Sequence, residues 1–264
     1  MSVLASVLLA TQIATHVAPP AGVTASLTLD RVVVDLVNRE RLKVTLHAAP
    51  LPDVQLSPIV GQRLLLAQVP IPLSNLAQPS RTASDTVVTF EVNLREVPEA
   101  VLGVPTELVP IRWEGRDARG DVVLNVMGEI DPNDGGRLML PVDKLMDNYA
   151  RLVDASVVPS LAEVAFRGLV SLYNPFNFDV VATRLSYRIT VGGESVMAGT
   201  RPGFRLRAAT ASDVLIEQSA PLADVAAGVL GAVVGQQPVR LDGAVVIRGP
   251  QGDRAIPLRL RGAL

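Results

Sequence analysis

Residue types that carry out chemistry in proteins are scarce in this chain. It has no cysteine and only two histidines, His16 and His47, among its 264 residues. Disulfides, thiolate metal sites, cysteine nucleophiles and lipid-modified cysteines are therefore excluded. Two histidines are too few for a histidine metal cluster or for most acid–base sites built on imidazole. We therefore expect no catalytic residues, no metal ligands and no cofactor, and so no enzyme.

Several partial motifs do not change this expectation. Residues 131–136 read Asp-Pro-Asn-Asp-Gly-Gly, but the fifth position of the would-be calcium loop is Gly135 and the twelfth is Val142, so we interpret the stretch as a turn. The glycine-rich run 228–235 lacks the Lys-Ser/Thr pair of a phosphate loop, and close packing of a helix explains it better. No Gly-x-Ser-x-Gly elbow is present. Paired carboxylates would meet only in the folded protein, and nothing in the sequence points to such a pair.

The composition describes a folded chain with balanced charge. Hydrophobic residues make up 48%, and 24 basic residues face 26 acidic ones, for a formal net charge of −2. The balance argues against nucleic acid as a partner, since phosphate binding requires a basic excess. No dense run of lysine and arginine is present from which a polybasic membrane patch is expected.

The N-terminus has two interpretations. Residues 2–18 form a segment without a charged side chain. The length of this segment suits the apolar region of a secretion signal. No basic residue precedes this run, and His16 spoils the small-x-small cleavage pattern, so an ordered apolar arm that packs on a domain or a partner is the alternative. A signal or anchor predicts the cell envelope or periplasm, and a packed arm predicts the cytoplasm.

An internal repeat organises the rest of the chain. Three short matches share an offset of 128 residues: 82–85 with 210–213, 101–103 with 229–231, and 110–115 with 238–243. A fourth, 31–38 with 167–174, has an offset of 136. We predict an apolar arm or signal remnant at 1–23, a divergent first domain at 24–146, a linker at 147–159 and a second domain at 160–264. Trp113 corresponds to Leu241, which favours a core position for Trp113 over a ligand contact.

The second copy predicts short strands separated by turns. Residues 185–191 alternate apolar and polar side chains, and Gly192-Gly193 is typical of a two-residue hairpin. Strands are expected at 164–172, 180–191, 204–208, 213–217, 239–248 and 255–261, and helices at 221–234 and 143–153. The fold class is therefore all-β: two tandem immunoglobulin- or fibronectin-like antiparallel β-sandwich domains, each with a short covering helix.

The second copy also resembles a known family. Residues 173–177 read Tyr-Asn-Pro-Phe-Asn, an alternating strand with Leu-Ser-Tyr at 185–187 follows, and Val-Met-Ala-Gly at 196–199 closes the run. This is similar to the late-embryogenesis-abundant type-2 family, or WHy (water-stress and hypersensitive-response) domain, in which an Asn-Pro pair, a tyrosine-containing strand and a V-x-A-x-G-like element recur. The first copy departs from the pattern, since Asn38 is followed by Arg39. The motif residues, to which we assign a mainly structural role, are Asn174, Pro175, Asn177, Tyr187 and Gly199.

The resemblance implies a sandwich without enzymatic activity, associated with stress protection, and in some relatives with lipid binding through an apolar groove. We therefore predict a non-enzymatic protein that binds a lipid or another apolar or amphiphilic ligand, or that protects cellular components under stress. The alternative is a structural subunit of a bacterial envelope or filament assembly. It would pair with a protein partner or with itself through the N-terminal arm or exposed strand edges.

Overall fold

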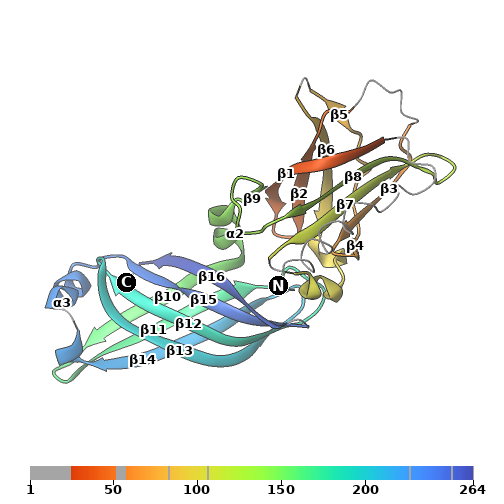
Figure 1. The fold of residues 1–264 in the computed structure, drawn as a ribbon. Coiled ribbons are helices and arrows are strands. Elements are labelled where there is room, and N and C mark those ends of the chain that lie inside the picture. The colour runs from red at the N-terminus through yellow and green to blue at the C-terminus, as the bar shows by residue number, and fades with distance from the viewer. Residues whose placement is uncertain are drawn as a thin grey trace, which may run out of the picture.

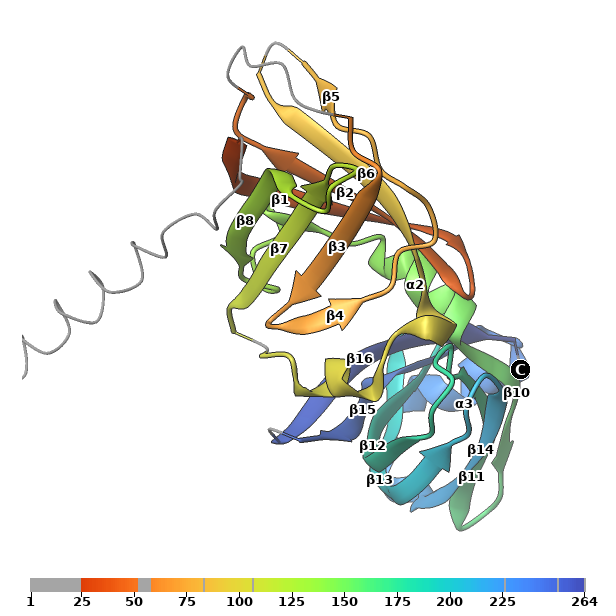
Figure 2. The ribbon, with the colours of Figure 1, turned by 90° about the vertical axis from the view of Figure 1, so that its right-hand side faces the viewer.

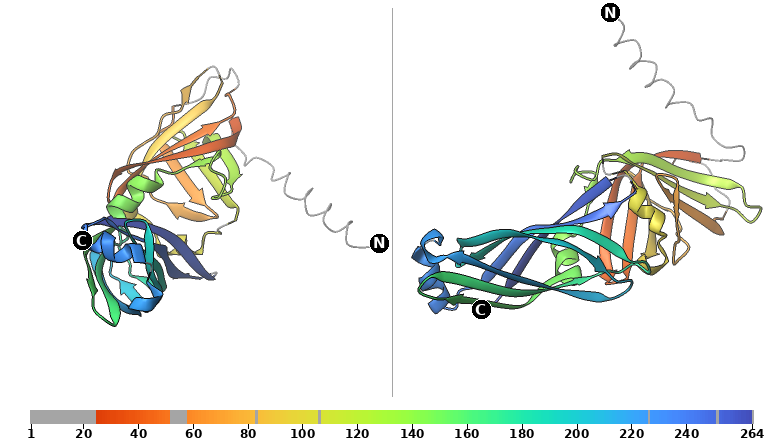
Figure 3. Two further views of the ribbon diagram at one scale, coloured as in Figure 1. Left: turned by 90° about the vertical axis from the view of Figure 1, so that its left-hand side faces the viewer. Right: turned by 90° about the horizontal axis from the view of Figure 1, so that it is seen from below.

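A computed structural model describes residues 25–51, 58–82, 84–105, 107–225, 227–250 and 252–263. The predicted apolar arm and signal region lie outside the described residues. The all-β prediction is confirmed: two β structures lie end to end, with helix α2 (Val142–Tyr149) at their junction (Figures 1 and 3). We call residues 25–139 the N-terminal half and residues 150–262 the C-terminal half. No helix in the described ranges is long and apolar enough to cross a membrane.

The N-terminal half is a single sheet that is bent into two layers. Its strands are β1 (Ala25–Asn38), β2 (Arg41–Ala48), β3 (Gly61–Leu66), β4 (Val69–Ile71), β5 (Ser80–Arg81), β6 (Thr86–Asn93), β7 (Val109–Arg116), β8 (Val122–Ile130) and β9 (Leu138–Met139). Two 3₁₀ turns, η1 (Leu94–Glu96) and η2 (Glu99–Gly103), follow β6. The strand order is β4-β3-β7-β8-β1-β2-β6-β5, and β9 pairs with β1.

Strand β1 holds the two layers of this half together. Its first residues, Ala25–Thr28, pair in parallel with β8, and after a register shift near Leu29 it pairs antiparallel with β2. The parallel pairings of β1 with β8 and β9 depart from a purely antiparallel expectation. Between the layers Trp113 and Phe90 are fully buried, so the core interpretation of Trp113 is confirmed.

The C-terminal half is a two-layered sandwich. Its strands are β10 (Ala150–Pro159), β11 (Glu163–Tyr173), β12 (Val180–Val191), β13 (Glu194–Leu206), β14 (Ala211–Pro221), β15 (Val239–Gly249) and β16 (Gly252–Gly262); η3 (Leu222–Asp224) and α3 (Ala227–Val234) follow β14. The three-stranded sheet has the order β10-β11-β14, and the four-stranded sheet has the order β13-β12-β15-β16. Gly192 and Gly193 have φ of +60° and +91°, as the predicted hairpin turn requires.

Residues 147–159 are not the linker that the sequence predicted. They form the end of α2 and the whole of β10, which pairs with β11 from Ala150 to Pro159. The strand was missed because it lies at the edge of its sheet and a bulge between Leu152 and Asp154 breaks its apolar alternation. The helix predicted at 143–153 is accordingly shorter and ends at Tyr149.

The two halves have matching strand orders. The segment β1-β2-β6 of the first corresponds to β10-β11-β14 of the second, and β4-β3-β7-β8 corresponds to β13-β12-β15-β16. In this correspondence β11 is the counterpart of β2, so the sequence match of 31–38 with 167–174 aligns strands in different positions. The duplication itself remains a prediction.

An aromatic cluster joins the halves. The rings of Tyr149, at the end of α2, and Tyr173, at the end of β11, are stacked with centroids 6.3 Å apart. Arg39 lies 5.6 Å from the Tyr173 ring centroid, and the Tyr173 hydroxyl donates to Oε1 of Glu40 over 3.2 Å. Phe176 packs against the apolar cores of both halves. These contacts fix the end-to-end arrangement that Figure 2 shows from the side.

Candidate functional site

The two long edges of the C-terminal sandwich differ. At the edge formed by β13 and β14, side chains cross between the sheets. The Tyr187 hydroxyl donates to Gln218 over 2.8 Å, the Gln218 amide donates to the carbonyl of Ala198 over 3.0 Å, and Arg201 donates to the carbonyl of Leu215. This edge is closed by polar contacts.

The opposite edge, between β10 and β16, contains a groove of about 970 Å³ under α2. Its lining residues are Met146, Asp147, Ala150, Arg151, Leu152, Pro257, Arg259, Leu260 and Arg261. This volume lies in the range of pockets that bind small molecules. We define these residues as the β10–β16 groove.

Apolar residues of the core and exposed arginines both line the groove. Leu260 and Ala150 are buried and continuous with the core, and Leu152 is partly buried against it. Arg151, Arg259 and Arg261 are exposed, with Asp147 as the single acidic lining residue. Such a surface suits a ligand with an apolar body and an anionic head.

The alternation of β16 produces this arrangement. Leu258 and Leu260 point into the sandwich, and Arg259 and Arg261 point outward, as the two-residue period of a strand requires. At the end of the groove the side chain of Leu152 packs directly on the backbone of Gly262. A Cβ on Gly262 would lie 2.9 Å from Cδ2 of Leu152, so a glycine is needed at this position.

The family-motif residues lie elsewhere and are positioned as structural elements. Asn174 is 2% exposed; its amide donates to the carbonyls of Phe178 (2.8 Å) and Leu206 (3.2 Å), and its Oδ1 accepts from the backbone of Phe176. Pro175 is half-buried and Asn177 is exposed in the same loop. Tyr187 and Gly199 meet at the closed edge. The structure thus places three of the five in one loop and the other two at the closed edge, and none lines the β10–β16 groove.

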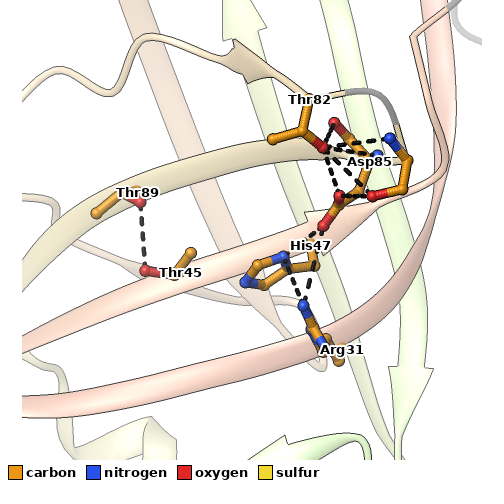
Figure 4. Close-up of polar contacts among 7 residues, drawn as sticks. Arg31, Thr45, His47, Thr82, Asp85 and Thr89 are labelled. Atoms are coloured by element: carbon orange, nitrogen blue, oxygen red, sulfur yellow. Dashed lines mark hydrogen bonds and ion pairs between the residues drawn. The ribbon is translucent and has the colours of Figure 1, made fainter.

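A polar cluster in the N-terminal half was missed by the sequence reasoning (Figure 4). Nδ1 of His47 lies 2.7 Å from Oδ2 of Asp85, and the hydroxyls of Thr82 and Ser84 donate to Oδ1 over 2.6 and 2.7 Å. Arg31 approaches to 4.0 Å from the same carboxylate. The hydrogen bond from Thr82, with those from His47 and Ser84, holds the pKa of Asp85 well below its usual range.

In this cluster an imidazole and two hydroxyl groups surround one carboxylate. Nδ1 of His47 faces both Oδ2 of Asp85, at 2.7 Å, and Nη2 of Arg31, at 3.4 Å. The Ser84 hydroxyl is engaged by the carboxylate rather than by the imidazole. The repeat of segment 82–85 at 210–213 was the one sequence signal for this site. The second copy has no equivalent of His47, because Asp213 lies opposite Ser171 in the sheet.

The calcium-like stretch forms a turn. The backbone of Asp134 donates to the carbonyl of Asp131, and Oδ1 of Asp131 accepts from the backbone of Asn133. Its polar atoms are therefore engaged in local hydrogen bonds. In the part of the chain that the structure describes, no group of three or more histidine or acidic residues is arranged to hold a metal ion.

No family model and no curated protein matches the chain. Solved structures that resemble it include a crystal structure of a protein from Archaeoglobus fulgidus, 13% identical with a TM-score of 0.31, over 42% of this chain and 92% of that one. A solution structure of an Arabidopsis thaliana protein is 18% identical with a TM-score of 0.38, over 44% and 80% of the two chains. Another, described as a late embryogenesis abundant (LEA) protein, is 18% identical with a TM-score of 0.32, over 44% and 68%. LEA-type proteins are thus among the similar structures, over less than half of this chain.

Proposed function

We propose that this chain is a non-enzymatic binding protein of the late-embryogenesis-abundant type-2 class, whose ligand is an anionic amphiphile held in the β10–β16 groove. The observation that carries the proposal is the pairing of buried Leu260 and Ala150 with the exposed guanidinium groups of Arg259 and Arg261 in one groove. An acyl chain would bury apolar surface inside, and a carboxylate or phosphate would accept hydrogen bonds at the rim.

The difference between the two sandwich edges also supports this location. The contacts of Tyr187, Gln218 and Arg201 join the sheets by hydrogen bonds at the other edge, whereas Leu152 meets Gly262 by an apolar contact at this one. Stress protection and a structural role in an assembly remain predictions from the sequence.

Palmitate binding, measured by isothermal titration calorimetry and native mass spectrometry, tests the proposal. We expect one palmitate per chain in the full-length protein. Leu152→Glu, which puts an anion inside the groove, should weaken binding at least about tenfold, as expected for burial of an unpaired charge. Leu108→Glu adds the same charge at an exposed apolar residue of the N-terminal half and is the matched control.

The rim is tested with a second ligand. Arg259→Gln combined with Arg261→Gln should weaken binding of palmitate and leave binding of the uncharged alcohol of equal chain length unchanged, because only the anion uses the guanidinium groups. Absence of palmitate binding, or equal binding by the Leu152→Glu and Leu108→Glu variants, would show that the groove is not a ligand site.

A further inference from the structure

The outer face of the four-stranded sheet carries a concentration of arginine. Six exposed arginines project from β12, β15 and β16: Arg184, Arg188, Arg240, Arg248, Arg259 and Arg261. We call these six the arginine face. The acidic residues that project from the same side of these strands are Asp242 and Asp253.

Strand register assembles this face. Arg240 of β15 lies opposite Thr190 of β12 and Arg261 of β16, and the next outward row places Asp242 between Arg188 and Arg259. Neighbouring strands are about 4.8 Å apart, so the guanidinium groups are close neighbours. The six arginines are spread over three strands, and along the chain only Arg259 and Arg261 lie within three residues of each other. The sequence therefore shows no dense basic run.

The charge of this face is opposite to that of the remaining protein. The whole chain has 24 basic and 26 acidic residues, so with six arginines and two aspartates on the face, 18 basic and 24 acidic residues remain elsewhere. Two other exposed arginines of this half form ion pairs, Arg167 with Glu217 and Arg205 with Asp179. Within the described ranges none of the six arginines has an ion-pair partner. With six arginines against two aspartates, the face has a net positive charge of four.

We propose that the arginine face docks this protein on an anionic lipid bilayer. This inference rests on the proposed function for its choice of partner, since Arg259 and Arg261 belong both to the face and to the rim of the groove. Docking would place the groove at the membrane surface from which an amphiphile is taken or to which it is delivered.

The side chains between the arginines favour a bilayer over nucleic acid. Ala244 and Pro257 lie among the arginines on the outer side of β15 and β16. Outward-pointing aromatic rings, on which bases would stack, are missing from the described residues of these two strands. A sheet face with interspersed small apolar residues fits the planar, charged interface of a membrane.

Vesicle sedimentation tests the proposal with the full-length protein. We expect binding to vesicles of phosphatidylcholine with about 30% phosphatidylglycerol, little binding to phosphatidylcholine alone, and release when salt is raised to about 0.5 M. The variant Arg184→Gln/Arg188→Gln/Arg240→Gln removes three charges from the face without touching the groove. It should reduce partitioning by about 100-fold, from roughly a factor of five for each arginine.

The matched control is Arg63→Gln/Arg119→Gln/Arg167→Gln, which removes three exposed arginines from other surfaces and gives the same net charge. We expect it to bind vesicles like the wild type. Equal loss in both triple variants would reduce the effect to net charge and overturn the proposal. Wild-type binding to a DNA duplex instead of to vesicles would also overturn it.

Palmitate binding separates this inference from the proposed function. The triple variant of the face should retain palmitate affinity while losing vesicles. A wild type that binds vesicles but no palmitate would support the docking face and refute the groove, and the reverse result would refute docking alone.

Discussion

The hydroxyl of Tyr187 donates a hydrogen bond to Oε1 of Gln218 over 2.8 Å and thereby joins the four-stranded sheet to the three-stranded sheet. Burial raises the pKa of Tyr187, and the nearby charge of Arg201 lowers it to a smaller extent. Gly199 lies opposite Tyr187 in the sheet, and its missing side chain leaves room for the phenol. The glycine that ends the V-x-A-x-G-like element is therefore required for packing at the closed edge.

The first prediction concerns this glycine. A Cβ on Gly199 would lie 2.7 Å from the Tyr187 hydroxyl and would also collide with Gln218. We expect Gly199→Ala to lower the free energy of unfolding by about 1–3 kcal/mol, measured by urea denaturation. Gly231→Ala is the control, because a Cβ there meets nothing within 4 Å and alanine favours the helix. Equal stability of the two variants would contradict the role of Gly199.

The second prediction concerns the Asn-Pro motif. Asn174 satisfies the carbonyls of Phe178 and Leu206 from a buried position, so Asn174→Ala leaves both without their donor. Each buried unsatisfied group costs about 1–3 kcal/mol, and we expect a loss of at least about 2 kcal/mol in unfolding free energy. Asn177→Ala, at an exposed residue of the same loop, should change stability by less than about 0.5 kcal/mol. A stable Asn174→Ala variant that binds palmitate more weakly would instead indicate a role in ligand contact.

Local sequence patterns predicted the features of the fold that depend only on residues close together in the chain. The alternation in β12, the turn at Gly192 and Gly193 and the corner at Asn174 are set by side-chain period, positive φ and local hydrogen bonds. The Asn-Pro loop was recognised for the same reason. These elements needed no information about which strand pairs with which.

The candidate sites depend on strand pairing and were not predictable in this way. Arg188, Arg240 and Arg261 become neighbours only through the register of three strands. His47, in β2, and Asp85, directly before β6, are 38 residues apart and meet only because these two strands pair. Strand β10 was missed because its apolar residues are interrupted by a bulge, and with it one wall of the groove was missed.

The third prediction concerns the pH dependence of stability. The hydroxyl of Thr82, with His47 and Ser84, lowers the pKa of Asp85 in the folded state, and an unfolded aspartate titrates near about 3.9. The stabilisation is therefore present above about pH 4 and is lost as the pH falls toward the lowered folded value. We expect Asp85→Asn to lower the melting temperature at pH 6, and this difference should shrink at about pH 2.5.

The control for this series is Asp154→Asn, which removes an exposed carboxylate of β10. It should change the melting temperature little at either pH. A difference between wild type and Asp85→Asn that is the same at both pH values would show that the ionised carboxylate is not the stabilising species.

The fourth prediction concerns the junction of the halves, where the buried Tyr149 hydroxyl has no hydrogen-bond partner. Burial, with a smaller contribution from Tyr173, raises the pKa of Tyr149 to about 12. Tyr149→Phe removes the unsatisfied hydroxyl and keeps the stacked ring, so its stability should equal or exceed that of the wild type by up to about 1 kcal/mol. Tyr173→Phe, which loses the hydrogen bond to Glu40, should instead be destabilised by about 1 kcal/mol.

Because an unfolded tyrosine ionises near about pH 10, the wild type should lose stability from there toward pH 12, and Tyr149→Phe should lose less. Melting temperatures of the three proteins at about pH 8 and pH 11 check both effects. A less stable Tyr149→Phe protein would reveal that the hydroxyl has a partner in solution.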